Sequence, residues 1–320
     1  MPTLQQLRYL VAVADTLNFS RAAETCRVAQ PTLSVQLKEL EARLDARLVE
    51  RTRARVVLTP MGREVARRAR AMLAELDDIR EVARRDDPGA PQATLQIGVV
   101  QTVGAYVLSV AMPALRLAFP NMRIRVREER SDTLLRQLRD GMHDVLLLPE
   151  EVRRPDMECR RLLAESLMVV LPADHPLAGQ DSIAPGDLAG ETILTMERDR
   201  RLHDQIVQLC ADVGAYHARD YEGTTLDTLR QMIAVGMGLS LLPSLYVRSE
   251  VIREQLVVAR PMSTRAPVRH ISLVWRSDAP REGTYLALVD SLRDSLRPWD
   301  TAPVGDGPDG TGHPAGKVSA

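Results

Sequence analysis

The stretch FSRAAETCRVAQPTLS, residues 19–34, decides the fold of the N-terminal part of the chain. Ser20 is a suitable N-cap for a short helix. A tight connection over 27–30 leads to Pro31, which suits the first turn of a second helix. That helix carries its apolar residues on one face, at Leu33, Leu37, Leu40 and Leu44. Two helices joined by a short turn predict a helix-turn-helix.

The flanking sequence completes this unit. On the N-terminal side, Thr3 and Gln6 form a capping box ahead of an amphipathic helix. On the C-terminal side, two short β runs at 48–51 and 55–58 are joined by three residues, an arrangement typical of the wing of a winged helix. Residues 1–58 are therefore expected to form one winged helix-turn-helix domain.

The polar face of the second helix predicts contact with DNA. Residues 1–58 hold nine Arg and Lys against six Asp and Glu, a local charge of +3, whereas the remainder of the chain sums to −4. Hydroxyl and amide groups near the start of a helix can reach base edges, and arginines on a wing can contact phosphates. These residues alone also permit a merely solvated helix face. The expected DNA contacts are Gln30, Pro31, Thr32, Ser34, Gln36, Lys38, Arg51 and Arg53.

A long helix follows the wing, because Thr59 and Pro60 supply an N-cap and a first-turn proline. Its apolar residues recur with heptad spacing, which predicts dimerisation with a second copy, and packing on its own chain is the alternative. The residues of this dimerisation seam are Val65, Ala69, Met72, Leu76 and Ile79. Residues 59–91 are expected to form this linker helix and a hinge, since Pro and Gly end the helix at 86–91.

Residues 92–299 alternate between β and α signals. Strands are expected at 95–100, 123–128, 145–148, 167–171, 192–196, 238–242 and 270–275, with helices between them. This alternation favours an open α/β fold of mostly parallel strands, which would form a regulatory domain. The remaining residues, 300–320, are rich in Gly and Pro and are expected to be disordered.

Composition excludes several classes of protein. The 320 residues carry a net charge of −1 and only 3% aromatic residues, which argues against a polycationic protein and against a stacking platform for single-stranded nucleic acid. Three cysteines, an odd number, argue against a disulfide scaffold and for a reducing compartment. The uncharged stretch 88–115 is interrupted by Gly, Pro and polar residues, so no membrane span is expected. We therefore expect a soluble, cytoplasmic protein.

Signatures of catalysis are also missing. The six histidines have no zinc-ligand spacing, and no Walker loop, dinucleotide fingerprint or nucleophile elbow occurs. We expect no enzyme activity, no metal and no cofactor. An α/β enzyme with an added DNA-binding domain is the rival from another class, and it lacks a nucleophile–base constellation.

Several motifs in the first 62 residues resemble LysR-type transcriptional regulators. They are FSRAA (19–23), QPTLS (30–34), LE (40–41), LVERT (48–52) and LTPMG (58–62), in that order. The resemblance implies a winged helix-turn-helix followed by an α/β regulatory domain of two subdomains, like a periplasmic binding protein. It also implies a homodimer or homotetramer on double-stranded DNA sites with dyad symmetry, with RNA polymerase as a further partner. It leaves activator and repressor roles open.

Within that family, the regulatory half is similar to the OxyR group of peroxide-responsive regulators. The matching segments are QTVG (101–104), LHDQ (202–205), TLDTLR (225–230) and GLSLLP (238–243), and the resemblance spans about residues 3–298. That group joins a peroxidatic cysteine to a resolving cysteine nine residues later. Here Arg201 occupies the first position and Cys210 the second. The two-thiol switch therefore cannot operate between these positions.

Two hypotheses for the signal remain. In the first, the nearby cations Arg200, Arg201 and His203 lower the pKa of Cys210, and peroxide oxidises this single thiol to a sulfenic acid. In the second, Cys210 is packed on the apolar face of a helix, and a small molecule binds between the subdomains. The resemblance implies a peroxide or effector pocket that contains Thr102, Ser131, Asp204 and Arg276.

Overall fold

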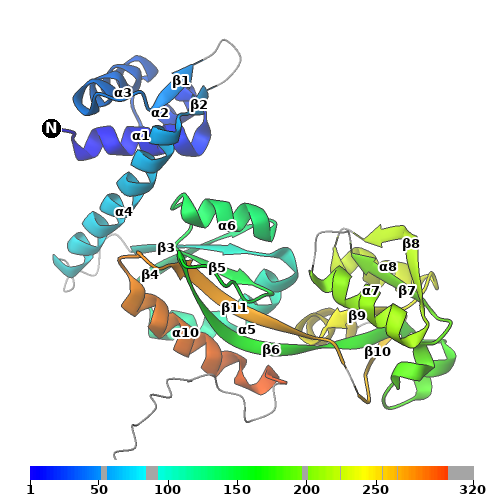
Figure 1. Ribbon diagram of the computed structural model, residues 1–320. Helices are drawn as coiled ribbons and strands as arrows, with labels where there is room; N and C mark the ends of the chain where they lie inside the picture. The colour runs from blue at the N-terminus through cyan, green and yellow to red at the C-terminus, as the bar shows by residue number, and fades with distance from the viewer. Residues whose placement is uncertain are drawn as a thin grey trace, which may run out of the picture.

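The computed structural model describes residues 1–51, 56–83, 93–196, 201–223, 225–253, 255–264 and 266–301. The chain forms an N-terminal head, a long helix and a two-lobed C-terminal half (Figure 1). Within these ranges, none of the helices has both the length and the apolar character needed to cross a membrane. The predicted hinge at 86–91 and nearly all of the predicted tail lie outside the described residues.

The head contains three helices and a two-stranded wing. The elements are α1 (Leu4–Thr16), α2 (Phe19–Cys26), α3 (Gln30–Leu44), β1 (Val49–Arg51) and β2 (Val56–Leu58). The predicted capping box of Thr3 and Gln6 is present at the start of α1. The predicted cap of α2 was wrong by two residues, because Asn18 Oδ1 accepts hydrogen bonds from the backbone N–H groups of Ser20 and Arg21. Leucines of α3 form the centre of the head core with residues of α1 and α2, namely Leu10, Val13, Ala22, Leu33, Leu37 and Leu40.

Helix α4 (Pro60–Ala83) leads out of the head. Its first half packs on the head, with Ala66 and Ala69 almost fully buried in the head core. Its 24 residues span about 36 Å, so the second half extends well beyond the head (Figure 1).

The first lobe is built around parallel strands. Strand β3 (Ala93–Val99) pairs in parallel with β4 (Met122–Glu128) and β5 (Val145–Leu148). Helices α5 (Gln101–Ala118) and α10 (Glu282–Leu296) share one apolar cluster with this sheet, and α6 (Ser131–Arg139) belongs to another cluster. Figure 1 shows α6 on the opposite side of the sheet from α5 and α10.

Two long antiparallel strands connect the lobes. Strand β6 (Met157–Pro172) pairs with β11 (Val268–Arg276) from Val268↔Ser166 to Arg276↔Met157. In the first lobe β11 also pairs antiparallel with β5, and beyond the crossing β6 pairs antiparallel with β9 (Ser240–Pro243) and β10 (Val257–Pro261). The expectation of mostly parallel strands was therefore wrong, because the two crossover strands run in opposite directions.

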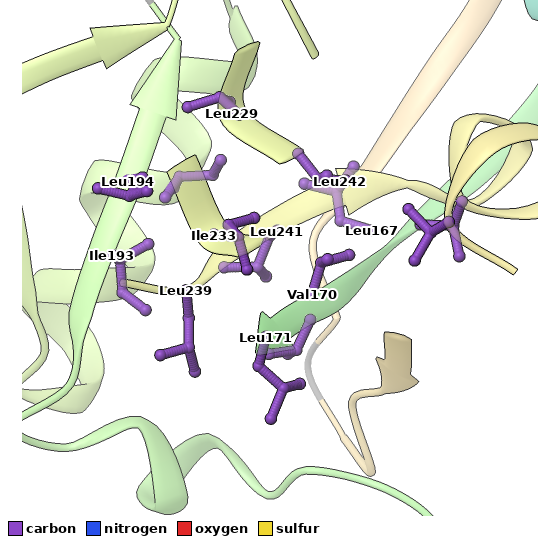
Figure 2. Packing of buried hydrophobic residues seen from close by; sticks show 14 of the residues in the cluster. Leu167, Val170, Leu171, Ile193, Leu194, Leu229, Ile233, Leu239, Leu241 and Leu242 are labelled. Atoms are coloured by element: carbon purple, nitrogen blue, oxygen red, sulfur yellow. The ribbon is translucent and has the colours of Figure 1, made fainter. Parts of the chain in front are cut away.

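The second lobe surrounds the far half of β6. It contains β7 (Thr192–Met196), α7 (Arg201–Val213), β8 (Tyr216–Gly223), α8 (Leu226–Ala234), β9, α9 (Ser244–Tyr246) and β10. Leucine, isoleucine and valine side chains from these elements converge in its core, among them Leu171, Leu194, Ile233 and Leu242 (Figure 2). Each lobe thus has its own core, and β6 and β11 pass between them.

Candidate DNA interface and inter-lobe cavity

The start of α3 presents several of the predicted DNA contacts to solvent. Gln30, Pro31, Thr32 and Lys38 are exposed. Ser34 is half-buried, and its Oγ accepts a 2.8 Å hydrogen bond from Gln30 Nε2. These side chains lie opposite the leucines that anchor α3 in the head, as the amphipathic pattern predicted.

Gln36 occupies a different environment from its neighbours. Gln36 Oε1 accepts a hydrogen bond from Gln6 Nε2 (3.2 Å), and Gln36 Nε2 donates to Glu39 Oε2 (3.4 Å). The side chain is half-buried between α1 and α3. Both polar ends of this amide thus have partners inside the head.

Val35 is a surface residue that the sequence analysis missed. Its side chain is 54% exposed on α3, between the exposed Thr32 and Lys38. An apolar side chain on such a face can contact the methyl group of thymine. Helical spacing could have identified it, because Val35 follows Leu33 by two residues and so lies about 200° around the helix from the leucine face.

Glu41 fixes the base of the wing. Its Oε1 accepts hydrogen bonds from the backbone N–H groups of Leu48 (2.8 Å) and Val49 (3.1 Å). Arg51 ends β1, which pairs antiparallel with β2, as expected for a wing. Arg53 lies outside the described residues.

The predicted dimerisation seam divides into two parts. Ala69 is 1% exposed in the head core, and Val65 packs against the same core. Val65 and Ala69 therefore pack against the head of their own chain, the alternative to dimerisation. Farther along α4, Met72 and Ile79 are 54% and 58% exposed, and Leu76 is half-buried.

A cavity of about 670 Å³ lies between the lobes. Three of the four predicted pocket residues, Thr102, Ser131 and Asp204, line it. They come from the first turns of α5, α6 and α7. The volume falls within the range of about 300–1,000 Å³ that is common for small-molecule sites.

Arg269 places a buried guanidinium in the wall of this cavity, which Arg130 also lines. Arg269 is 4% exposed, and its Nε donates to Glu165 Oε2 at 2.7 Å. Its Nη1 and Nη2 donate to Thr102 Oγ1 (3.2 Å) and to the Thr102 carbonyl (2.9 Å). The other Glu165 oxygen accepts from the N–H of Leu245 at 2.7 Å. This buried pair joins both crossover strands to the start of α5.

Arg276, the fourth predicted pocket residue, is not among the residues that line this cavity. It ends β11, seven residues after Arg269, and a strand advances about 23 Å over that length. There, Arg276 Nε donates to Asp278 Oδ1 (3.0 Å) and Nη1 donates to the carbonyl of Leu138 (3.2 Å). The two arginines of one strand therefore belong to its opposite ends.

Cys210 is a core residue of the second lobe. It is 3% exposed and belongs to the same apolar cluster as Leu202 and Ile206, outside the cavity lining. Burial raises the pKa of the Cys210 thiol to about 11. A backbone hydrogen bond lowers this pKa, but by less than burial raises it. His203, which could have lowered this pKa, is engaged with β7, since its Nδ1 lies 2.9 Å from the Met196 carbonyl oxygen. Arg200 lies outside the described residues.

The other two cysteines lie elsewhere. Cys26 packs against the head core, and Cys159 packs against the cluster that contains α6 in the first lobe. Cys159 Sγ accepts a hydrogen bond from the N–H of Val152 at 3.4 Å. All three cysteines fall within the described ranges and are free thiols.

Comparison with known proteins gives matches over both halves of the chain. Residues 4–63 match the family of bacterial regulatory helix-turn-helix proteins of the lysR family, and residues 88–297 match the LysR substrate binding domain. A hydrogen peroxide-inducible genes activator of Dickeya chrysanthemi is 37% identical over 294 residues, which cover 92% of this chain and 96% of the relative. The DNA-binding transcriptional dual regulator OxyR of Escherichia coli K12 is 35% identical, covering 91% and 94%.

Solved structures agree with this assignment. A full-length OxyR variant from Pseudomonas aeruginosa has a TM-score of 0.76 at 32% identity, covering 94% of this chain and 98% of the other. An OxyR mutant from Corynebacterium glutamicum has a TM-score of 0.62 at 28% identity, covering 93% of each chain. With the winged head, the long helix and the two-lobed regulatory half in the same order, this chain belongs to the LysR family of bacterial transcription regulators and is similar to its OxyR members.

Proposed function

We propose that this protein is a DNA-binding transcription regulator of the OxyR type whose DNA binding is controlled by a small molecule in the inter-lobe cavity. The observation that carries the proposal is the contrast between two sites. The cavity offers a buried arginine and three helix starts to a ligand, whereas Cys210 is buried in apolar core away from it. In this role the protein catalyses no reaction. It acts in the cytoplasm, where DNA is accessible.

The head supplies the DNA contacts. Thr32, Ser34, Val35 and Lys38 are the candidates for reading the major groove, and Gln30 and Pro31 lie at the start of the same helix. Helix N-termini favour phosphate, and wing arginines add backbone contacts, for which Arg51 and Arg53 are the candidates. A head with a net charge of +3 on a body of −4 directs this surface towards DNA.

A second copy of the chain is the proposed partner of α4. Met72, Leu76 and Ile79 continue the heptad spacing beyond the head core, and two of the three are more than half exposed. Burying such side chains contributes about 1.5–3 kcal/mol each relative to full exposure. A dimer through this stretch would place two heads on one dyad-symmetric DNA site. The homotetramer and the contact with RNA polymerase rest on the family resemblance.

Oxidation of Cys210 by peroxide is the second candidate for the signal. It is favoured by the names of the relatives, which are hydrogen peroxide-inducible activators. It is opposed by a pKa of about 11, at which roughly one thiol in 10⁴ is ionised at pH 7. Because the thiolate is the nucleophile, reaction at this position requires α7 to open first.

Peroxide treatment of the full chain separates the two candidates. DNA duplexes selected from a random-sequence library provide the binding target, and fluorescence anisotropy measures affinity before and after graded peroxide, alongside mass spectrometry of Cys210. We expect no change in affinity at peroxide doses that oxidise an exposed thiol, and the same result for Cys210→Ala. A peroxide response that disappears in Cys210→Ala would establish the thiol as the sensor and overturn control by a ligand alone.

A further inference from the structure

We propose that the inter-lobe cavity takes a zwitterionic small molecule, with a carboxylate at its buried floor and an ammonium group at its acidic mouth. This inference deepens the proposed function and rests on it, because it names the ligand class of the same cavity. It is carried by the distribution of charge and burial over the cavity wall.

The floor of the cavity holds a fixed donor group. A guanidinium has five N–H donors, and within the described part of the chain Arg269 uses three of them, on Glu165 and Thr102. Since those bonds fix the plane of the group, the remaining donors keep a defined direction. Arginine binds carboxylates through such paired donors. Arg269 is also 4% exposed, so a ligand group that meets it is largely removed from water.

Two helix N-termini add donors near the same floor. Helices α5 and α6 begin at the cavity wall, and neither Val100 nor Arg130 provides a side-chain hydrogen bond to cap them within the described residues. Uncapped first-turn N–H groups and the helix dipole both favour an anion.

The mouth of the cavity has the opposite charge. Four carboxylates line the cavity, at Asp132, Glu150, Glu151 and Asp204, against the guanidinium groups of Arg130 and Arg269. Arg130 Nε lies 3.7 Å from Asp132 Oδ1, and Arg269 is already paired with Glu165. Two arginines outside the cavity lining also pair with these carboxylates, Arg136 with Asp132 and Arg153 with Glu151, each at 3.3 Å. Asp132 and Asp204 are exposed, whereas Arg269 is buried, so the negative charge lies outside the donor floor. Asp204 has no hydrogen-bond or ion-pair partner among the described residues, so it is the carboxylate at the mouth that favours an ammonium group.

The arrangement discriminates between ligand charges. A dianion would bring its second carboxylate against the acidic mouth, and a dication would bring an ammonium group against the donor floor; like charges at such distances repel. Leu135, Leu202 and Val268 offer apolar wall between the two regions for a short carbon chain. A molecule with one group of each sign satisfies both ends.

Calorimetric titration of the full chain with three five-carbon probes tests this class. The probes are 5-aminopentanoate, glutarate and 1,5-diaminopentane, which differ only in their terminal charges. We expect 5-aminopentanoate to bind at least tenfold more tightly than either of the others, equivalent to about 1.4 kcal/mol. Equal or tighter binding of glutarate or the diamine, or no binding of any probe at millimolar concentration, overturns the ligand class.

Variants of α7 locate the binding. Asp204 is exposed and makes no hydrogen bond or ion pair to the rest of the described chain, so Asp204→Asn leaves the fold intact. We expect it to weaken 5-aminopentanoate binding several-fold while glutarate binding improves. The matched control is Asp212→Asn on the same helix, outside the cavity lining, which should bind as the native chain does. Equal effects of both variants overturn the site. Control by a cavity ligand is judged separately, by the peroxide experiment on Cys210→Ala.

Discussion

Arg70 and Asp15 form an ion pair, Nη2 to Oδ1 at 2.5 Å, that joins the long helix α4 to the first helix of the head. The other terminal nitrogen of Arg70 donates to the carbonyl of Asp140, just after α6. Helix α6 begins at Ser131 in the cavity wall. One guanidinium thus contacts the head and an element whose other end lines the cavity.

A second connection runs along β11. Arg269 lines the cavity near one end of this strand, and Arg276 ends it. Arg276 and Arg67 of α4 hold opposite oxygens of Asp278, at 3.0 and 2.9 Å. Partial burial alone would raise the pKa of Asp278, but the hydrogen bonds from these arginines outweigh it and lower the pKa. Two elements therefore join the cavity to α4.

Replacing Arg70 should loosen the head. We expect Arg70→Met to speed amide hydrogen exchange severalfold in the last turn of α1 and around 138–142, because both lose their bond to α4. Exchange followed by mass spectrometry measures this. Arg68→Met is the matched control, since Arg68 is 71% exposed and its ion-pair partner in the described part of the chain is Glu64 of the same helix. If the two variants exchanged alike, Arg70 would not hold the head in place.

Adjacent residues of α3 should differ in their effect on DNA binding. We expect Val35→Ser to reduce affinity for selected duplexes more than for random ones, by about 1 kcal/mol for one lost apolar base contact. Gln36→Ala should instead lower the stability of the head by about 1 kcal/mol, since it leaves Gln6 without one hydrogen-bond partner. Anisotropy titrations and urea unfolding separate the two. A changed sequence preference for Gln36→Ala with unchanged stability would reverse these roles.

The buried pair of Glu165 and Arg269 should be costly to break. Glu165→Gln leaves a guanidinium at 4% exposure without its counter-charge, and we expect the free energy of unfolding to fall by about 3–5 kcal/mol. Glu158→Gln is the comparison, because Glu158 and Arg160 form a partly exposed pair at 3.0 Å on the same strand. Such pairs contribute about 0–1 kcal/mol. Similar losses in urea unfolding for both variants would contradict a special role for the buried pair.

Sequence patterns predicted the head closely because its core is local. The spacing of Leu33, Leu37 and Leu40 fixed the buried face of α3, and the capping box fixed the start of α1. The heptad spacing of α4 was less informative, since the same residues suit the head core and a second copy. Ala69 is buried in the head core, whereas Ile79 is exposed and free to contact a second copy. Only the tertiary packing distinguishes the two residues.

The cavity was predictable only in part. Thr102, Ser131 and Asp204 stand at helix starts, which sequence can locate. The choice between Arg269 and Arg276 depends on where β11 crosses between the lobes, and β11 is positioned by β6, about a hundred residues earlier in the chain. The antiparallel pairing of these strands is equally non-local, and the burial that raises the pKa of Cys210 comes from the assembled second lobe.

Acid should destabilise the first lobe through His143. This side chain is 3% exposed, with Nε2 2.8 Å from Gln137 Oε1 and Nδ1 unpaired among the described residues. Burial, followed by repulsion from Arg127, lowers the pKa of His143 from 6.5 to about 4. Because the folded-state pKa lies below the unfolded one, the unfolded chain takes up the proton first. The stability due to neutral His143 is complete above about pH 6.5 and is lost as the pH falls towards 4.

The expected loss between pH 7 and pH 5 is about 2 kcal/mol of unfolding free energy from this residue alone. Urea unfolding of the native chain and of His143→Asn at both pH values measures it, because the other titrating groups are common to both proteins. His143→Asn should lose less stability than the native chain over this interval, although it is less stable at pH 7. His175→Asn is the control, since it removes a less deeply buried imidazole elsewhere in the chain and should follow the pH profile of the native chain. Parallel pH profiles for the native chain and His143→Asn would show that His143 is not the titrating group.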